Sequence, residues 1–128
     1  MHYIEGLETT RSEELYKRAL MILPAGVSSH IRACPTWSPY PIFFDHGKGS
    51  HFWDVDGNEY IDYPLGMGPL IHGHTPTRII DAVREQLMKG TMPGLNTELE
   101  IKTAEKISRI VPNAEMVVFT NTGLEATL

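Results

Sequence analysis

Residues 117–128, VVFTNTGLEATL, begin with an apolar run, pass through polar residues and a glycine, and finish with residues that favour helices. This order predicts a strand over residues 116–119, a tight turn, and a helix that begins just before the chain ends. The amides at a helix N-terminus bind anions because they are free and lie at the positive end of the helix dipole. Thr122, Gly123 and Leu124 are therefore a candidate phosphate site, and an ordinary strand-to-helix turn is the simpler alternative.

A short apolar strand of this kind is typical of a parallel sheet that helices cover on both faces. The chain contains no second strand of that type, and a lone strand would leave both its edges without hydrogen-bond partners. We therefore expect an α/β fold of which this chain holds the N-terminal portion. Residues 1–63 should form an N-terminal segment, and residues 64–128 should begin a larger, incomplete domain.

Two helices are predicted before that strand, each with apolar residues at helical spacing. Thr75 is suited to cap the first helix, and Gly90 is suited to end it. The second helix begins with a capping box of Thr97 and Glu100 and ends before Pro112. Each helix should have a buried apolar face, formed by Ile79, Ile80, Val83 and Leu87 in the first and by Leu99, Ala104, Ile107 and Ile110 in the second.

The N-terminal segment is predicted to hold a helix, a loop and a small antiparallel meander. Ser12 is a plausible N-cap for the helix. Residues 24–42 are rich in proline and should form an irregular loop, which in a compact protein often carries function. Residues 42–63 then alternate short strands with turns, and Asp56–Gly57 is the strongest turn signal.

The composition excludes several functional classes. A hydrophobic content of 41% with 21% charged residues is ordinary for a globular protein, and a net charge of −5 argues against a general nucleic-acid binder. No apolar run approaches the ~20 residues that span a bilayer. The acidic first twenty residues are unlike a signal or transit peptide. The single cysteine, Cys34, excludes an internal disulfide and fits a reducing compartment, so we expect a cytoplasmic protein without membrane or nucleic-acid partners.

Two patterns resemble metal sites, and neither supports one. The run DVDGN, residues 54–58, has its glycine at the fourth position, whereas a calcium-binding EF-hand loop needs glycine at the sixth and glutamate at the twelfth. A turn is the better interpretation. His72 and His74 have no further ligands nearby in sequence, so we expect no metal there.

Arg32 lies between apolar residues in the run VSSHIRA, residues 27–33. Such an arginine can hold a carboxylate through two parallel hydrogen bonds. A surface or structural ion pair is the commoner role, and the pattern alone leaves both open.

Four ordered segments together resemble the class III pyridoxal-phosphate-dependent aminotransferases. They are LPAGVSSHIRA (23–33), FFDHGKGSHFWDVDGNEYIDY (43–63), GMGPLIHGH (66–74) and TELEIKTAEKISRIVPNAEMVVFTNTGLEAT (97–127). The resemblance covers residues 12–128. It implies the fold type I architecture, a mainly parallel sheet between helices, with pyridoxal 5′-phosphate as cofactor and a homodimer as the complete protein.

For the cofactor, the resemblance implies that the backbone amides of Thr122, Gly123 and Leu124 hold the phosphate. The family has a hydroxyl side chain where this chain has Leu124, so one hydrogen bond to the phosphate is absent or replaced. None of the five lysines stands at a matching position. The Schiff-base lysine is therefore expected beyond Leu128, and the 128 residues alone should be inactive.

For the substrate, the resemblance implies binding by Ser29 and by Arg32, which would pair with a carboxylate. It is strongest to the aminomutases of the family, which make the porphyrin precursor 5-aminolevulinate from glutamate 1-semialdehyde. Met67 falls where those enzymes have a tryptophan near the substrate, and methionine is more pliable and cannot stack. Met67 and Leu124 favour an alternative, an aminotransferase acting on a β- or D-amino acid. A third alternative is a non-catalytic interaction module.

Overall fold

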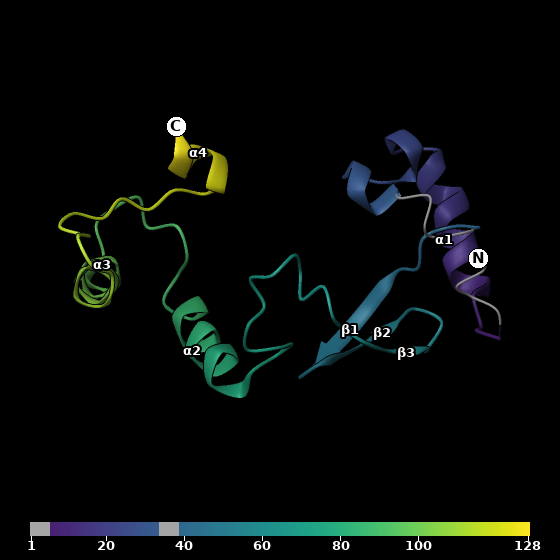
Figure 1. Cartoon of the computed structure of the whole chain (residues 1–128), viewed down its shortest axis with the longest axis horizontal. Coiled ribbons are helices and arrows are strands. Elements are labelled where there is room, and N and C mark those ends of the chain that lie inside the picture. The colour runs from purple at the N-terminus through teal and green to yellow at the C-terminus, as the bar shows by residue number, and fades with distance from the viewer. Residues whose placement is uncertain (1–5, 34–38) are drawn as a thin grey trace. The chain divides into compact units, whose positions relative to one another are not determined.

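A computed structural model describes residues 6–33 and 39–128 of the chain (Figure 1). Cys34 lies outside these described residues. The chain divides into two compact units, Met1–Glu85 and Gln86–Leu128. This boundary differs from the one expected after residue 63, and the idea that residues 64–128 begin a larger domain stays a prediction.

The first unit begins with helix α1, Thr10–Leu20, and two short 3-10 turns follow it, η1 at Pro24–Gly26 and η2 at His30–Ala33. The turn η1 packs directly on α1. A Cβ added at Gly26 would lie 2.6 Å from the ring of Tyr16, so the close approach requires glycine. Helix α1 therefore positions the loop that contains η2.

Helix α1 begins earlier than the sequence predicted, and another residue caps it. Its N-cap is Thr9, whose side chain makes no capping hydrogen bond. The carboxylate of Asp56 instead accepts from the backbone amides of Arg11 at 2.6 Å and Ser12 at 3.0 Å, and from the Ser12 hydroxyl. The prediction that Ser12 caps the helix was wrong, because a carboxylate 44 residues away fills that role and Ser12 is fully buried beneath it.

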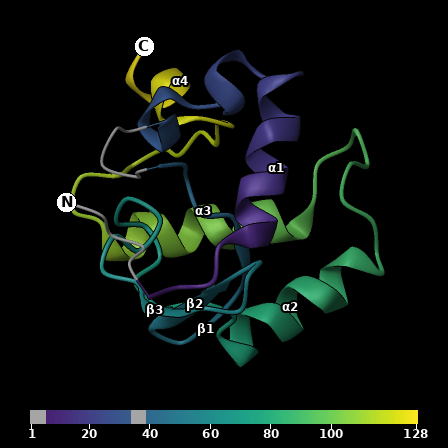
Figure 2. The same cartoon turned by 90° about the vertical axis from the view of Figure 1, so that its right-hand side faces the viewer.

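Three antiparallel strands follow in the order β1-β2-β3: Phe44–Lys48, His51–Asp54 and Glu59–Ile61 (Figure 2). Phe52 on the central strand lies opposite Gly47 on one side and Tyr60 on the other. The rings of Phe52 and Tyr60 stack at 4.9 Å. The predicted meander is confirmed.

The predicted turn at residues 54–58 is also confirmed, and buried Asp54 organises it. Its carboxylate accepts from the amides of Asp56 and Asn58 at 3.0 and 2.8 Å and from the Tyr60 hydroxyl at 2.8 Å. Burial acts to raise the pKa of the Asp54 carboxyl, but the hydrogen bonds from Asn58 and Tyr60 outweigh it and hold that pKa below its usual value. Burial and the bond to Asp54 raise the pKa of the Tyr60 hydroxyl.

Helix α2, Thr77–Leu87, follows a loop that returns to the sheet. The Pro76 carbonyl accepts its first hydrogen bonds. Thr75 does not cap the helix as predicted. Its φ is +47°, and its hydroxyl donates to the carbonyl of Gly47 at 3.1 Å, because the chain is paired with the sheet at this point.

The second unit contains helix α3, Glu98–Ile110, and the short helix α4, Gly123–Thr127. The Thr97 hydroxyl accepts from the Glu100 amide at 3.2 Å, which confirms the Thr97 half of the predicted capping box of α3. Of the helices that the structure describes, none has the length and apolar character needed to cross a membrane.

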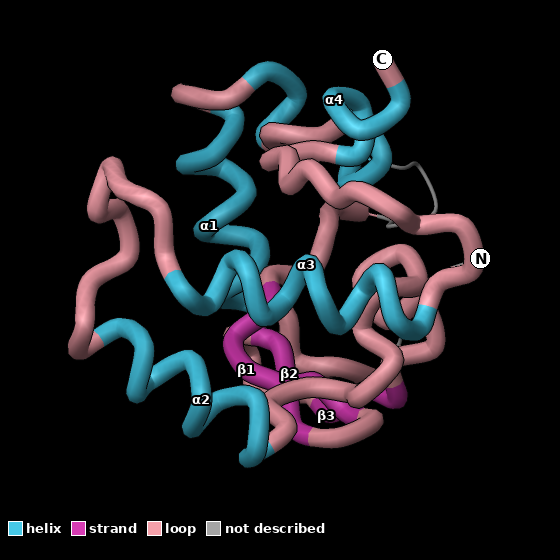
Figure 3. The backbone as a smooth tube through the Cα atoms, turned by 90° about the vertical axis from the view of Figure 1, so that its left-hand side faces the viewer, coloured by secondary structure: helices cyan, strands magenta, loops and turns pink. Residues whose placement is uncertain are grey.

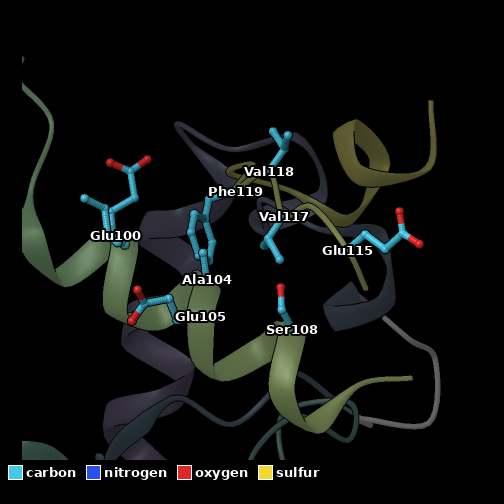
Figure 4. Close-up of a pocket in the computed structure, with 9 residues that line it drawn as sticks. Glu100, Ala104, Glu105, Ser108, Glu115, Val117, Val118 and Phe119 are labelled. Carbon is cyan, nitrogen blue, oxygen red and sulfur yellow. The ribbon is translucent and has the colours of Figure 1, made fainter. Parts of the chain in front are cut away.

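Residues 116–119 form no strand, and Figure 3 draws them as part of the loop before α4. Their side chains nonetheless alternate as in a strand. Val117 and Phe119 face α3, whereas Met116 and Val118 are 93% and 85% exposed (Figure 4). The strand prediction was wrong for this chain because a strand needs a hydrogen-bonded neighbour, and within the described ranges only the meander strands are paired.

Candidate functional site

Ser29 and Arg32 lie together on the loop that α1 positions. The Arg32 amide donates to the Ser29 carbonyl at 3.0 Å, so one tight turn joins the two residues. Ser29 is half-buried and Arg32 is exposed. In the described part of the chain, no acceptor bonds to the Arg32 guanidinium. An exposed arginine in this state is free to take a carboxylate from outside the chain.

Met67 lies in the loop between β3 and α2. Its amide donates to the Pro64 carbonyl at 2.9 Å, its φ is +70°, and 72% of its surface is exposed. A methionine so exposed does not contribute to a core, so its side chain is available for a ligand.

His74 and His72, which the sequence raised as a pair, have different surroundings. The Nε2 atom of His74 lies 2.7 Å from the carboxylate of Asp62, and these side chains are only 16% and 11% exposed. His72 is exposed. The sequence analysis did not single out Asp62, because a carboxylate twelve residues before a histidine has no recognisable spacing.

The turn at Thr122 begins helix α4 with a complete capping box. The Thr122 hydroxyl accepts from the Glu125 amide at 3.2 Å, and the Glu125 carboxylate accepts from the amides of Asn121 and Thr122 at 2.8 and 3.2 Å. The sequence analysis missed Glu125, although the spacing Thr-x-x-Glu is a recognisable signal.

The amides of Gly123 and Leu124 have no acceptor among the residues that the structure describes. A Cβ added at Gly123 would meet nothing within 4 Å, so the space beside this backbone is open. Two adjacent amides with room in front of them fit a phosphate oxygen. The Thr122 amide, expected to join them, is bonded to Glu125 instead.

A groove of about 530 Å³ runs between α3 and residues 116–119 (Figure 4). Ala104, Val117 and Phe119 form its apolar side, and glutamates stand at its edge. Within residues 6–33 and 39–128, no three acidic, histidine or cysteine side chains are placed to hold a metal ion. The groove lies along a segment with unpaired backbone, and we assign no chemistry to it.

Ser29, Arg32 and Met67 belong to the first unit, and Thr122, Gly123 and Leu124 belong to the second. Their roles in binding stay predictions. Among the residues that the structure describes, the Arg32 guanidinium and the amides of Gly123 and Leu124 have no partner.

The family model described as aminotransferase class III matches residues 33–128. Among curated proteins, the glutamate-1-semialdehyde 2,1-aminomutase of Thermodesulfovibrio yellowstonii is 46% identical over 122 residues, which is 95% of this chain and 29% of that protein. The enzyme of the same name from Methanothermobacter thermautotrophicus is 51% identical over 118 residues, which is 92% of this chain and 27% of that protein. The chain thus spans less than a third of these relatives.

Two solved structures resemble the fold closely. A transaminase with PLP bound has a TM-score of 0.89 at 35% identity and covers 95% of this chain and 28% of its own. A β-phenylalanine aminotransferase from Variovorax paradoxus has a TM-score of 0.84 at 28% identity and covers 91% of this chain and 26% of its own.

Proposed function

Because this chain belongs to the class III aminotransferase family, we propose that it is the N-terminal portion of a pyridoxal-phosphate-dependent aminomutase. The proposed reaction converts glutamate 1-semialdehyde into 5-aminolevulinate, a precursor of porphyrins. The observation that carries the proposal is the name shared by curated relatives that match nearly the whole chain at 46% and 51% identity. The reaction moves an amino group between neighbouring carbons, so it consumes no second amino acceptor.

The pair of free amides supports phosphate binding by the second unit. In the proposal, the amides of Gly123 and Leu124 hold the phosphate of pyridoxal 5′-phosphate, and Thr122 keeps the turn in shape through its cap. Leu124 offers the phosphate no hydroxyl, so its contribution is the backbone amide alone. When bound, the cofactor supplies an electron sink for the pair of electrons left by proton removal from the substrate.

Arg32 is proposed to bind the substrate carboxylate. Its guanidinium is exposed and, in the described ranges, has no competing acceptor, so binding would not require an existing ion pair to break. The Arg32 amide donates to the Ser29 carbonyl at 3.0 Å, so one tight turn joins the two residues, and the Ser29 hydroxyl is proposed to give the carboxylate a second hydrogen bond. Together they would orient the substrate by its carboxylate end.

The lysine that carries the cofactor is proposed to lie on the polypeptide after Leu128. Lys17 and Lys102 each pair with a glutamate four residues away on an exposed helix face, at 2.6 and 2.9 Å, so neither is proposed as the cofactor lysine. The complete protein is proposed to be a cytoplasmic homodimer, in keeping with the single cysteine and the family resemblance. The 128 residues alone would bind groups without catalysing the reaction.

A second candidate is an aminotransferase acting on a β- or D-amino acid. The exposed Met67 favours it, as does the structural similarity to transaminases that include a β-phenylalanine aminotransferase. Such an enzyme would need a separate amino acceptor.

The test uses the full-length polypeptide that contains this chain, loaded with pyridoxal phosphate and given glutamate 1-semialdehyde without any amino acceptor. Formation of 5-aminolevulinate supports the aminomutase. Amino-group transfer from a β- or D-amino acid that occurs only when an acceptor is added supports the second candidate. A protein that develops no visible absorbance from bound cofactor contradicts both.

A further inference from the structure

We propose that Asp62 and His74 are a positioning pair that holds the loop of residues 64–73, and with it Met67, in place for substrate binding. The inference rests on the proposed function and on the position of Met67, which falls where the aminomutases of the family have a tryptophan near the substrate. It concerns residues to which neither the sequence motifs nor the proposed chemistry gave a role.

The pair ties the two ends of the 64–73 loop to each other and to the sheet. At the first end, the Asp62 amide donates to the Ser50 carbonyl at 2.8 Å, and the Asp62 carboxylate accepts from the Leu65 amide at 2.8 Å. At the second end, His74 and Gly49 exchange backbone hydrogen bonds of 2.8 and 3.0 Å. The imidazole of His74 then reaches the other oxygen of Asp62 at 2.7 Å. One carboxylate thus closes the loop.

Two glycines let the imidazole and the returning chain lie flat against the sheet. A Cβ at Gly47 would lie 2.4 Å from the ring of His74. A Cβ at Gly73, where φ is +71°, would lie 2.5 Å from the Gly49 carbonyl oxygen. Neither Gly47 nor Gly73 has room for a side chain, so the closed loop requires glycine at both positions.

The loop needs such an external restraint because its own conformation is unfavourable. Leu65 and Met67 both have positive φ, +48° and +70°, a region that side chains with a Cβ rarely occupy. Residues in such regions persist only when the surrounding structure imposes them. Met67 is largely exposed and has no core packing to hold it. Backbone hydrogen bonds within the loop, such as that from the Met67 amide to the Pro64 carbonyl, hold its local shape, and the pair at its ends anchors that shape to the sheet.

The ionised carboxylate of Asp62 can only accept, so Nε2 of His74 carries the proton that it donates. This identifies matched substitutions. The side-chain amide nitrogen of glutamine reaches about as far from the backbone as Nε2, whereas that of asparagine reaches only as far as Nδ1. His74→Gln should therefore keep the hydrogen bond, and His74→Asn should lose it. His72→Gln is the control, because His72 is exposed on the same loop.

The experiment measures kcat and KM for the amino substrate on the full-length, cofactor-loaded protein, together with deuterium uptake by residues 64–73. We expect His74→Asn to raise KM by about tenfold, the size of one lost hydrogen bond to a charged group, with little change in kcat. Uptake by the loop should rise in the same variant. His74→Gln and His72→Gln should both resemble the parent, and the absorbance of the bound cofactor should not change in any variant.

Asp62→Ala and the double variant Asp62→Ala with His74→Asn provide a second test. If the two residues act through one hydrogen bond, the double variant should cost no more than Asp62→Ala alone, which also removes the acceptor of the Leu65 amide. Additive effects overturn the proposal, as does a His74→Asn protein with parental KM or a His74→Gln protein that fails to restore it. If the parent protein turns over no amino substrate, the proposed function is refuted instead. Deuterium uptake still tests whether the pair holds the loop, and unchanged uptake by residues 64–73 in His74→Asn would overturn the proposal.

Discussion

Replacing Asp56 by alanine should loosen helix α1 and the loop that this helix positions. The Asp56 carboxylate accepts from the amides of Arg11 and Ser12 and from the Ser12 hydroxyl, all in the first turn of the helix. Thr9, at the N-cap, makes no side-chain bond of its own to that turn. Alanine at position 56 therefore leaves two helix amides without their acceptor and removes the partner of a hydroxyl that is completely buried.

The cost follows from those contacts. Loss of a side-chain cap destabilises a helix by about 1 kcal/mol. A buried hydroxyl left without its partner adds about 1–3 kcal/mol. We expect about 3 kcal/mol in all, which is roughly a 100-fold change in the equilibrium for opening α1. Asp56→Asn keeps one acceptor and loses the charge that favours the positive end of the helix dipole, so it should cost about half as much.

Amide hydrogen exchange of the full-length protein, read by mass spectrometry on peptides that cover α1, measures this local opening directly. Asp45→Ala is the matched control. It removes an equal charge from strand β1, and among the residues that the structure describes the Asp45 carboxylate bonds only to the exposed His46, at 2.8 Å. Exchange in α1 should accelerate in Asp56→Ala and stay parental in Asp45→Ala. Equal exchange in the two variants would refute the claim that Asp56 caps the helix.

Three further predictions address the sites and the sheet. Arg32→Ala should weaken the binding of carboxylate substrates by about 2–4 kcal/mol and leave the absorbance of the bound cofactor unchanged. Arg18→Ala, which removes an equal charge from α1, should change neither. If Arg32→Ala and the parent have the same kinetics, Arg32 does not belong to the site. The pKa of the Asp54 carboxyl is lowered in the folded chain. The ionised carboxylate should therefore stabilise the fold fully above pH 3.8, its ordinary pKa, and this stabilisation should be lost as the pH falls below that value. The urea midpoint should consequently fall with acid more in the parent than in Asp54→Asn. Thr122→Ala should weaken cofactor binding about fivefold by removing the cap of α4, and Thr122→Ser should restore it. If a titration finds the same cofactor affinity in Thr122→Ala and the parent, the cap does not contribute to phosphate binding.

The sequence predicted those features whose causes lie within a few residues. The turn at residues 54–58, the cap at Thr97 and the alternation of strands in the meander all depend on local backbone preferences and side-chain reach. In each case the structure adds distances to a feature that the local pattern had already indicated. The loop pattern around Arg32 left a carboxylate site and an ion pair both open, and its role in substrate binding stays a prediction.

The features that the sequence did not predict join residues far apart in the chain. Asp56 caps a helix 44 residues earlier, and its own neighbourhood indicates only a turn. The hydrogen bond between Asp62 and His74 spans twelve residues, and it exists only because the sheet brings Gly49 beside the end of the loop. The periodicity of the sequence does not predict such pairings. The local pattern around Asp56 or Asp62 would be the same whichever distant residue its side chain contacted.

Residues 116–119 differ from both groups, because the sequence predicted a strand covered on both faces, whereas Met116 and Val118 are exposed and the backbone is unpaired within the described part of the chain. The exposed Met116 and Val118 opposite the inward Val117 and Phe119 show the two-residue period of a strand. The missing element is the hydrogen-bonded neighbour, which no property of these four residues can supply. A strand is defined by pairing, so the segment has strand-like side chains on an unpaired backbone.

Glu125 determines how the second unit can hold a phosphate. Its carboxylate bonds to the amides of Asn121 and Thr122, which lie beside the free amides of Gly123 and Leu124. A phosphate bound to the amides of Gly123 and Leu124 would lie beside the Glu125 carboxylate, and the two negative charges would repel each other. The anion must therefore either take only Gly123 and Leu124 or displace Glu125 and gain the Thr122 amide as well. The second arrangement restores the predicted three-amide site at Thr122, Gly123 and Leu124, and it gives up the half of the capping box that Glu125 provides.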